Sequence, residues 1–466
     1  MVSNRGPLSF TSDGGGAPVP GGSGGGLAAT LHPMLRATGA TWVAAAMSPA
    51  DRRAASLGLM HEEGLHIVTV EPDEAAYKMA YNVVSNATLW FCHHHLWDLA
   101  RRPRLDRRWQ EAWDAYRSVN RAFADAVAAA APIGARVLVQ DYHLSLVGAM
   151  LSADRPDLRS VHFSHTPFAD PCMLHALPSF AAGELLSGLA GFGACGFHTA
   201  RWESSFRAAF SDPALAAGAG APQTFVAPLG PHPDALAAEA ALEEVAAARS
   251  GLEELVGDRR LIVRVDRVEL SKNILRGLWA FEELLEVRPA WRGRVTMLAL
   301  AYPSREGLAE YLAYRAEIEH AVDRLNDTWG TGDWAPVVLR VADDRARSLA
   351  ALGAYDVLLV NPVRDGMNLV AKEGPLVNRA DGVLVLSKEA GAWEELHPAA
   401  IGVNPFDLTE TAAALDQALS MDRDERAARA ETLRKIVLGQ TAADWLDRQL
   451  AVAAALPPAG SGRAAG

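Results

Sequence analysis

The sequence has only three cysteines, Cys92, Cys172 and Cys195, among its 466 residues. So few cysteines exclude a framework of disulfide bonds and fit a reducing compartment. Its apolar runs are too short for a membrane-spanning helix, which needs roughly 18–20 such residues. The first residues, Met1-Val-Ser-Asn-Arg5, lack the apolar segment of a signal peptide. We therefore expect a cytoplasmic protein with no membrane partner.

Positive charge is also scarce, because 44 lysines and arginines face 56 acidic residues and give a formal net charge of −12. This balance argues against a nucleic acid as partner, so any phosphate must be bound by local cations. Half of the residues are apolar, as in an ordinary globular protein. A chain of this length exceeds what one hydrophobic core usually serves, which predicts two domains. The sequence leaves a homo-oligomer open.

Short apolar strands alternate with longer helical stretches almost throughout, which predicts parallel α/β construction. The expected strands lie at 41–47, 137–140, 161–163, 224–230, 261–267, 295–301, 337–341, 357–360 and 383–386. The expected helices lie at 109–131, 235–256, 411–438 and 442–455.

Pro231 and Pro233, followed by the helix at 235–256, mark a boundary between domains. The predicted domains are residues 1–232 and residues 233–440. Residues 441–456 are expected to form a closing helix that packs on the first domain, and residues 457–466 a disordered tail. The first strand looks clipped, which leaves open whether the native start codon lies upstream.

The most informative stretch is Asn361-Pro-Val-Arg-Asp-Gly-Met-Asn-Leu-Val-Ala-Lys-Glu373, which follows a buried strand. It predicts a tight turn at Asp365 and Gly366 and then a helix with Asn368 as its N-cap. The unpaired amides of a helix start and its positive dipole end favour an anion. Glu373 would repel a phosphate but can accept hydrogen bonds from sugar hydroxyls. The stretch therefore predicts a ligand with a phosphate end and a polyol end.

Three cations follow strand ends in the second half of the chain: Arg267, Lys272 and Arg305. Arginine can bind two phosphate oxygens at once and lysine acts as a point charge, so Arg267 and Lys272 can clamp a diphosphate. Taken singly, each could be a solvated surface charge. Their common position beside a predicted helix start favours a binding site.

Polar residues also follow two strands in the first half, Asp141-Tyr-His143 and His165-Thr-Pro-Phe168. Ligands of doubly wound sheets bind at such strand ends, whereas a single buried histidine is usually a satisfied core residue. Both interpretations stay open at this point. The glycine-rich loop from Asp13 to Gly26 is either a surface loop or a lid whose amides close over a phosphate.

Two patterns that could suggest a metal are set aside. In Cys92-His93-His94-His95, adjacent histidines point in different directions and no second ligand pair follows. Asp422-Arg-Asp424 lies at a helix start among surface charges. We expect no metal and no other cofactor.

These residues carry a resemblance to the trehalose-6-phosphate synthase family, retaining glycosyltransferases of family 20. The matching motifs are Val2-Ser-Asn-Arg5, Ser23-Gly-Gly-Gly-Leu27, Tyr81-Asn82, Ser85-Asn86, Leu89-Trp90, Asp141-Tyr-His143, His165-Thr-Pro-Phe168, Gly196-Phe-His-Thr199, Arg267, Ser271-Lys272, Ser304-Arg305, Arg364-Asp-Gly-Met-Asn-Leu-Val-Ala-Lys-Glu373, Ala390-Gly-Ala392 and Val403-Asn-Pro405. They run in family order over about residues 2–450.

The resemblance implies the GT-B fold, two Rossmann-like doubly wound parallel-sheet domains that face each other across an active-site cleft. It implies transfer of glucose from a nucleoside-diphosphate glucose to glucose 6-phosphate, giving α,α-trehalose 6-phosphate. The donor would be bound by Gly25, Gly26, Arg267, Lys272, Asp365, Asn368, Leu369, Val370 and Glu373. The acceptor would be bound by Arg5, Tyr81, Trp90, Asp141 and Arg305. The catalytic residues would be Arg267, Lys272, Asp365, His165 and Asp141.

The implied mechanism needs no metal, because fixed cations stabilise the charge that develops on the leaving diphosphate. The attacking hydroxyl would enter on the face of the leaving group, whose oxygen takes the proton. The two carboxylates of a retaining hydrolase are therefore not assumed. Closure of the domains would bring the two substrates together.

Some positions depart from the usual family pattern: Glu269-Leu-Ser-Lys-Asn273 stands for Asp-Tyr-Ser-Lys-Gly, Phe91 for proline, and His198 for glutamine. They remove none of the charges named above and bear only on the donor base. Family members use UDP-, ADP- or GDP-glucose, and the Lys272-Asn273 pair is similar to that of relatives that use a GDP-linked cyclitol. We expect GDP-glucose, with UDP-glucose as the close second.

Two rival functions remain. A pseudo-glycosyltransferase would join a nucleotide-linked cyclitol to an aminocyclitol phosphate, but the intact Arg364–Glu373 block favours the sugar enzyme. A catalytically silent sugar-phosphate sensor would be expected to lack one or more of Arg267, Lys272, His165 or Glu373, and all are present.

Overall fold

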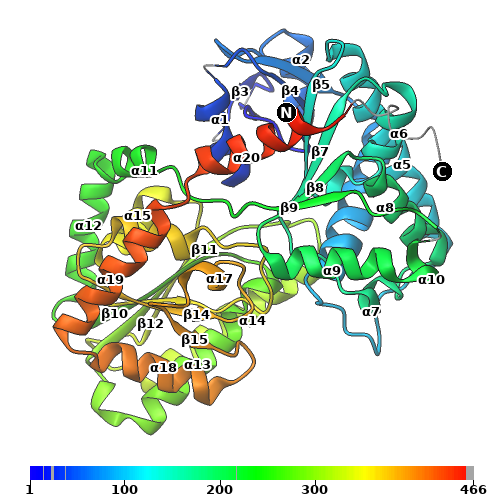
Figure 1. Cartoon of the computed structure of the whole chain (residues 1–466). Coiled ribbons are helices and arrows are strands. Elements are labelled where there is room, and N and C mark those ends of the chain that lie inside the picture. Colours follow the sequence, from blue (N-terminus) through cyan, green and yellow to red (C-terminus); the bar gives the residue numbers. More distant parts are fainter. Residues whose placement is uncertain (14, 22–25, 37, 217, 458–466) are drawn as a thin grey trace. The chain divides into compact units, whose positions relative to one another are not determined.

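The computed structural model describes residues 1–13, 15–21, 26–36, 38–216 and 218–457. The chain divides into two compact units, each with its own parallel sheet (Figure 1). Unit 1 comprises residues 1–228 and the segment from Ala442 onward, and unit 2 comprises Leu229–Thr441. The boundary that we expected at residue 232 thus lies at Leu229, and the predicted closing helix belongs to unit 1.

The sheet of unit 1 has seven parallel strands in the order β5-β4-β1-β6-β7-β8-β9. These strands are β1 (Val2–Ser3), β4 (Thr41–Ala45), β5 (His66–Val70), β6 (Arg136–Gln140), β7 (Arg159–Ser164), β8 (Ala194–Phe197) and β9 (Gln223–Val226). A small antiparallel pair, β2 (Phe10–Ser12) and β3 (Pro18–Pro20), stands apart from the sheet. The strand order reverses at β1, which pairs with both β4 and β6, and such a switch point opens a crevice at the carboxyl ends of the strands.

The helices of unit 1 are α1 (Gly26–Leu35), α2 (Pro49–Ser56), α3 (Glu74–Lys78), α4 (Trp90–His93), α5 (Arg107–Ala130), α6 (Val147–Asp154), α7 (Pro171–Leu174), α8 (Ser179–Ala190), α9 (Ala200–Ser211), α10 (Pro213–Ala216) and α20 (Ala442–Ala455), with a π-helix η1 (Met79–Leu89) and a 3₁₀ turn η2 (Tyr142–Leu144). The long helix α5 packs against β4 and β5. Helix α20 contacts β6 and β7, where Gln140 Nε2 donates to Gln449 Oε1 at 3.3 Å.

The sheet of unit 2 has six parallel strands in the order β12-β11-β10-β13-β14-β15. They are β10 (Arg260–Arg267), β11 (Val295–Tyr302), β12 (Val337–Val341), β13 (Val357–Val360), β14 (Val383–Ser387) and β15 (Ile401–Val403). Alternate residues of β10 supply two apolar layers, since Ile262 packs in one buried cluster and Leu261 and Val263 in another. A sheet buried on both faces explains why these strands are continuous apolar runs.

The helices of unit 2 are α11 (Pro233–Ala240), α12 (Glu243–Val256), α13 (Ile274–Val287), α14 (Ala309–Trp329), α15 (Arg345–Ala354), α16 (Val370–Val377), α17 (Trp393–Leu396), α18 (Leu408–Ser420) and α19 (Arg423–Leu438), with 3₁₀ turns η3 (Leu270–Lys272) and η4 (Pro289–Trp291). Helices α13, α14 and α18 belong to the apolar layer of Ile262, and α12, α15, α16 and α19 belong to the other.

The predicted α/β class is confirmed, but two predicted helices were wrong in extent. The helix expected at 235–256 is two helices, because Leu242 is extended, with φ −63° and ψ 148°. The helix expected at 411–438 also breaks, because the Asp422 side chain accepts a hydrogen bond from Glu425 N and caps a new helix. The expected disordered tail falls almost entirely on residues 458–466, outside the described residues. Across the described ranges, no helix is long and apolar enough to cross a membrane.

Candidate functional site

The turn after β13 carries the side chains that we singled out in the sequence. Asn368 has a positive φ of 91°, its Oδ1 accepts a hydrogen bond from Ala371 N at 3.1 Å, and its Nδ2 donates to Asp365 Oδ2 at 3.1 Å. The helix itself, α16, begins at Val370. The N-cap residue is Leu369, whose side chain makes no capping bond, so the predicted N-cap is one residue too early. The Asn368 side chain nevertheless accepts from an amide of the first turn, and it also orients Asp365. The N–H groups of Leu369 and Val370 lie at the start of the helix, so no carbonyl group within the helix accepts a hydrogen bond from them.

A second turn, Glu389–Ala392, supports the first through backbone hydrogen bonds. Asp365 N donates to Glu389 O at 3.2 Å, and Gly391 N donates to Asp365 O at 3.0 Å. A Cβ atom on Gly391 would lie 2.0 Å from Gly366 O, far inside van der Waals contact. The glycine in the Ala390-Gly-Ala392 motif is thus needed because two backbone segments touch there.

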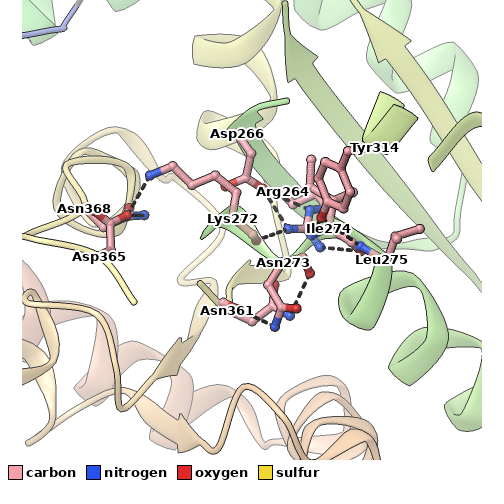
Figure 2. Close-up of polar contacts among 10 residues, drawn as sticks. All are labelled: Arg264, Asp266, Lys272, Asn273, Ile274, Leu275, Tyr314, Asn361, Asp365 and Asn368. Carbon is pink, nitrogen blue, oxygen red and sulfur yellow. Dashed lines mark hydrogen bonds and ion pairs between the residues drawn. The ribbon is translucent and has the colours of Figure 1, made fainter. Parts of the chain in front are cut away.

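Lys272 reaches the same turn from η3, the 3₁₀ turn that follows β10. Its Nζ lies 2.6 Å from Asp365 Oδ2, and each of the two side chains is 14% exposed (Figure 2). Burial alone would lower the pKa of Lys272, but the carboxylate of Asp365 raises the pKa above its usual value. Lys272 is therefore a charged ammonium beside the turn that precedes α16.

Arg267 and Arg305 share a buried carboxylate, Glu269, with which Arg267 Nη1 forms a 3.3 Å ion pair and Arg305 Nη1 a 3.2 Å one. Burial acts to raise the pKa of Glu269, but the charges of Arg267, Arg305 and Lys272 lower it to about 2. Arg267 is 57% exposed and can turn toward a ligand, whereas Arg305 is 12% exposed. Glu269 is a site residue that the sequence analysis treated only as a variation of the motif.

Glu373, the expected ribose ligand, has an arginine partner that the sequence analysis missed. Arg345 Nη1 donates to Glu373 Oε2 at 2.9 Å, and Arg345 Nε donates to Glu239 Oε2 at 3.0 Å. Burial opposes the charge on Arg345, but the two carboxylates raise the pKa of the guanidinium above its usual value. The sequence did contain a signal for this partner. Arg345 comes shortly after the predicted strand at 337–341, just as Arg267 and Arg305 come at or after the ends of predicted strands.

Together these groups make unit 2 suitable for a diphosphate joined to a polyol. Arg267, Lys272 and the first turn of α16 present positive charge, and Glu373 presents a carboxylate to hydroxyl groups. Figure 2 shows the Lys272 side chain extending to Asp365 beside Asn368.

Unit 1 brings Asp141 and His165 together at the switch point of its sheet. Asp141 directly follows β6 and has a positive φ of 71°, and its Oδ1 accepts a hydrogen bond from His165 N at 3.2 Å. A non-glycine residue in this backbone conformation costs about 1–3 kcal/mol, and such residues cluster at functional sites. The His165 ring donates from Nε2 to Gln140 Oε1 at 2.9 Å. Burial and the neighbours His198 and His162 hold the pKa of His165 well below its usual value, so its ring is neutral.

Tyr81 lies on the π-helix η1, an element that the sequence did not predict and that is often found at functional sites. Its ring stacks on those of Tyr77 and His143, with centroid distances of 5.8 and 5.7 Å. His143 Nδ1 in turn lies 4.0 Å from Asp141 Oδ2. The structure thereby connects Tyr81 with Asp141.

The remaining predicted residues differ in exposure. Arg5 is exposed just after β1, whereas Trp90 is only 2% exposed, so it has little surface for an acceptor in this conformation. Gly25 lies outside the described residues, and Gly26 is the first residue of α1. Arg305 belongs to unit 2.

The histidines that could have suggested a metal have separate partners. His93 Nδ1 accepts from Ala169 N at 3.1 Å, His94 Nδ1 donates to Trp90 O at 2.8 Å, and His95 Nε2 accepts from Asp170 N at 3.4 Å. Where side chains are described, no group of three or more histidine, cysteine, aspartate or glutamate residues is arranged to hold a metal ion.

The buried His162 predicts an acid-dependent loss of stability in unit 1. It is 1% exposed, and burial lowers its pKa from 6.5 to about 4. Below pH 6.5 the unfolded chain binds a proton that the folded chain excludes, so the free energy of unfolding decreases as the pH falls toward 4. By pH 4.5 this loss is about 2 to 3 kcal/mol. Urea denaturation at pH 7 and 4.5 should show a smaller loss for His162→Gln than for the wild type. Equal losses would contradict the assignment.

Comparison with known proteins relates these features to a family. The model of glycosyltransferase family 20 matches residues 1–454. The chain is 34% identical over 472 residues to a trehalose-6-phosphate synthase from Mycobacterium sp. (strain JLS), covering 96% of this chain and 94% of the relative. It is 32% identical over 465 residues to a bifunctional trehalose-6-phosphate synthase/phosphatase from Thermoproteus tenax, covering 96% of this chain but only 62% of that longer relative.

A solved structure gives the same result for the fold. It is an α,α-trehalose-phosphate synthase (UDP-forming) from Burkholderia xenovorans in complex with glucose-6-phosphate. It superposes with a TM-score of 0.84 at 29% identity, covering 97% of this chain and 99% of that chain. With the family model matching nearly the whole length and two parallel-sheet units of this kind, the chain belongs to glycosyltransferase family 20.

Proposed function

We propose that this chain transfers glucose from UDP-glucose to glucose 6-phosphate with retention of configuration, giving α,α-trehalose 6-phosphate. The observation that carries the proposal is the charged Lys272, paired with Asp365 at the start of α16 and close to Arg267. Membership of family 20 and the names of its relatives agree with this activity.

Unit 2 is proposed to bind the donor. Arg267 and Lys272 contact the diphosphate, the amides of Leu369 and Val370 support it, and Glu373 accepts hydrogen bonds from the ribose. Lys272 exchanges part of its bond with Asp365 for a phosphate oxygen, and Asp365, oriented by Asn368, accepts from hydroxyls of the donor glucose. Gly25 and Gly26 keep their proposed role as amides that close on the diphosphate.

Unit 1 is proposed to bind glucose 6-phosphate. Arg5 meets its phosphate, and Tyr81, Trp90 and Asp141 contact the sugar. Arg305 keeps its proposed role as a phosphate ligand. Trp90 can do so only after a local rearrangement, since it is almost fully buried. The His165 ring is neutral, and its Nε2–H donates a hydrogen bond to Gln140 Oε1. It is therefore suited to orient the donor glucose and not to act as the general base.

In the reaction the bond between C1 of glucose and the β-phosphate oxygen breaks, and a bond forms between C1 and the anomeric oxygen of glucose 6-phosphate. The proton of that hydroxyl passes to an oxygen of the departing diphosphate. Arg267 and Lys272 stabilise the negative charge that appears on the diphosphate, and this stabilisation is greatest in the transition state.

The preference for GDP-glucose that the Lys272-Asn273 pair suggested is not supported, because the solved relative is UDP-forming. We therefore place UDP-glucose first. The Asn273 side chain is bonded to protein groups, namely the carbonyl groups of Asn361 and Pro405 and the guanidinium of Arg276, and gives no reason to expect guanine.

The test is incubation of the purified protein with glucose 6-phosphate and, in separate reactions, UDP-, GDP- and ADP-glucose. Released nucleoside diphosphate and trehalose 6-phosphate are measured together. We expect equimolar release of both, fastest with UDP-glucose. Faster turnover with GDP-glucose would overturn the donor assignment but keep the reaction. No release with any donor would favour the sugar-phosphate sensor, and release only with a cyclitol donor and acceptor would favour the pseudo-glycosyltransferase.

A further inference from the structure

A buried arginine contacts the backbone of the turn Leu270–Asn273, which is called the Lys272 turn below. Arg264, on β10, is 1% exposed, and its guanidinium donates to Asp266 Oδ2 from Nε at 3.0 Å and from Nη2 at 2.9 Å. The same guanidinium donates to Lys272 O at 3.1 Å and to Ile274 O at 3.3 Å. It therefore binds the backbone on both sides of Asn273.

Asn273 fastens the same turn from the other side. It has a left-handed backbone with φ 58° and ψ 39°. Its Nδ2 donates to Asn361 O at 2.9 Å and to Pro405 O at 2.8 Å, and Asn361 Nδ2 donates back to Asn273 O at 3.4 Å. One amide thus connects the loops that follow β10, β13 and β15. Glycine could adopt this backbone conformation but could make neither of the side-chain bonds.

The surroundings are shaped to admit this arrangement. A Cβ atom on Gly277 would lie 2.0 Å from Arg264 Nη1, so only glycine leaves room for the guanidinium. The Tyr314 hydroxyl accepts a hydrogen bond from Ile274 N at 2.7 Å. This bond caps the first residue of α13, where the N-cap residue Asn273 makes no side-chain capping bond. Figure 2 shows these groups gathered around the turn, with the Lys272 side chain extending away from them toward Asp365.

We propose that Arg264 and Asn273 are positioning residues for Lys272, which hold its backbone so that its ammonium meets the donor diphosphate. This inference rests on the proposed function. Lys272 N donates to Glu269 O, and Lys272 O accepts from Arg264. Both backbone groups of Lys272 are therefore hydrogen-bonded, which restrains the position of its side chain.

Stability alone is a poor reason for this arrangement. Burying a guanidinium and a carboxylate is costly, and a well-packed apolar pair is often at least as stable. Unlike apolar packing, the Arg264 guanidinium makes directional hydrogen bonds. These bonds fix the carbonyl groups of Lys272 and Ile274, which lie eight and ten residues further along the chain. A displacement of about 1 Å at such a cation is enough to cost up to 100-fold in rate.

The test compares Asn273→Gly and Arg264→Lys with the wild type. Asn273→Gly retains the left-handed backbone and removes the two hydrogen bonds that Nδ2 donates, together with the one that Oδ1 accepts from Arg276 Nη1 at 2.9 Å. Arg264→Lys retains a charge for Asp266 and cannot bind both carbonyl groups. For both variants we expect the KM for UDP-glucose and the Kd for UDP to rise about tenfold, with the KM for glucose 6-phosphate unchanged within about twofold.

Asn378→Ala is the matched control. Asn378 is also buried in unit 2. Its Nδ2 donates to Leu352 O at 3.3 Å and Tyr355 O at 3.0 Å, and its Oδ1 accepts from Ala380 N at 3.0 Å and Gly382 N at 2.8 Å, so none of its bonds is with the Lys272 turn. It should lower the thermal midpoint as much as Asn273→Gly while leaving the KM for UDP-glucose and the Kd for UDP unchanged. A purely structural role would give the opposite pattern, in which all three variants affect UDP binding equally.

Unchanged UDP binding in both Asn273→Gly and Arg264→Lys would overturn the inference, and so would an equal effect of Asn378→Ala. Absence of turnover in the wild type would instead overturn the proposed function. Calorimetric titration with UDP does not depend on turnover, so the two failures are distinguishable.

Discussion

Replacement of Lys272 by methionine is expected to lower kcat/KM for glucosyl transfer by about 10³-fold or more. Methionine retains most of the volume of the side chain and removes the ammonium that stabilises the leaving diphosphate. It also removes the ammonium that lies 2.6 Å from Asp365, which is 14% exposed, and the loss of one member of a largely buried ion pair costs about 3 kcal/mol of stability. Steady-state kinetics and urea denaturation measure the two effects.

Two further variants separate catalysis from stability. The double variant Lys272→Met with Asp365→Asn removes both charges, so it should regain most of the stability and none of the activity. Lys388→Met removes an ammonium from a 48% exposed side chain that pairs with Glu410 at 2.8 Å, and should change neither property appreciably. Near-normal turnover in Lys272→Met would contradict the diphosphate clamp.

Substitution of Gly391 by alanine is expected to reduce transfer about 100-fold, although residue 391 has no proposed contact with substrate. Its new Cβ would lie 2.0 Å from Gly366 O and 3.0 Å from the Cα of Met367. Since both obstacles are backbone atoms, the turn that carries Asp365 and Asn368 must move. Kinetics with UDP-glucose and calorimetric titration with UDP should both show the loss.

The control for this change is Gly251→Ala. Gly251 lies inside helix α12, and a Cβ atom there would meet nothing within 4 Å. Alanine should raise the free energy of unfolding by up to about 1 kcal/mol and leave turnover unchanged, because it favours the helix. If Gly391→Ala behaved like Gly251→Ala, the backbone support of the Asp365 turn would be of no functional importance.

Five of the six second-half strands were predicted because they are buried on both faces and therefore appear as continuous apolar runs. The sixth, β15, has three residues and was missed. Strand β8, Ala194-Cys-Gly-Phe197, was missed because it contains glycine and no β-branched residue. The π-helix that carries Tyr81 was missed because its hydrogen-bond pattern has no distinct periodicity in the sequence. The breaks at Leu242 and Asp422 were missed because helical composition continues on both sides of each break.

The site residues divide in the same way. Asp365, Asn368 and Glu373 are close in sequence, so the local pattern of strand, turn and helix was enough to predict an anion site. Lys272 was predictable as a cation after a strand, but its bond with Asp365 spans 93 residues. Two other contacts also join distant segments: the ion pair of Arg345 with Glu373, and the close approach of the Gly391 backbone to the Gly366 carbonyl group.

The order and type of most elements, the family and the local chemistry of the Asp365 turn could be predicted, because they depend on residues that are neighbours along the chain. The direction of the Lys272 side chain could not, because it depends on contacts between segments that are distant in the sequence. Arg264 is an unremarkable charge within a strand until the fold places it beneath the Lys272 turn, where Gly277 leaves room for it and Asp266 balances its charge. The physical reason is that a buried hydrogen bond depends on distance and direction in space, and these arise only when the strands are assembled into a sheet.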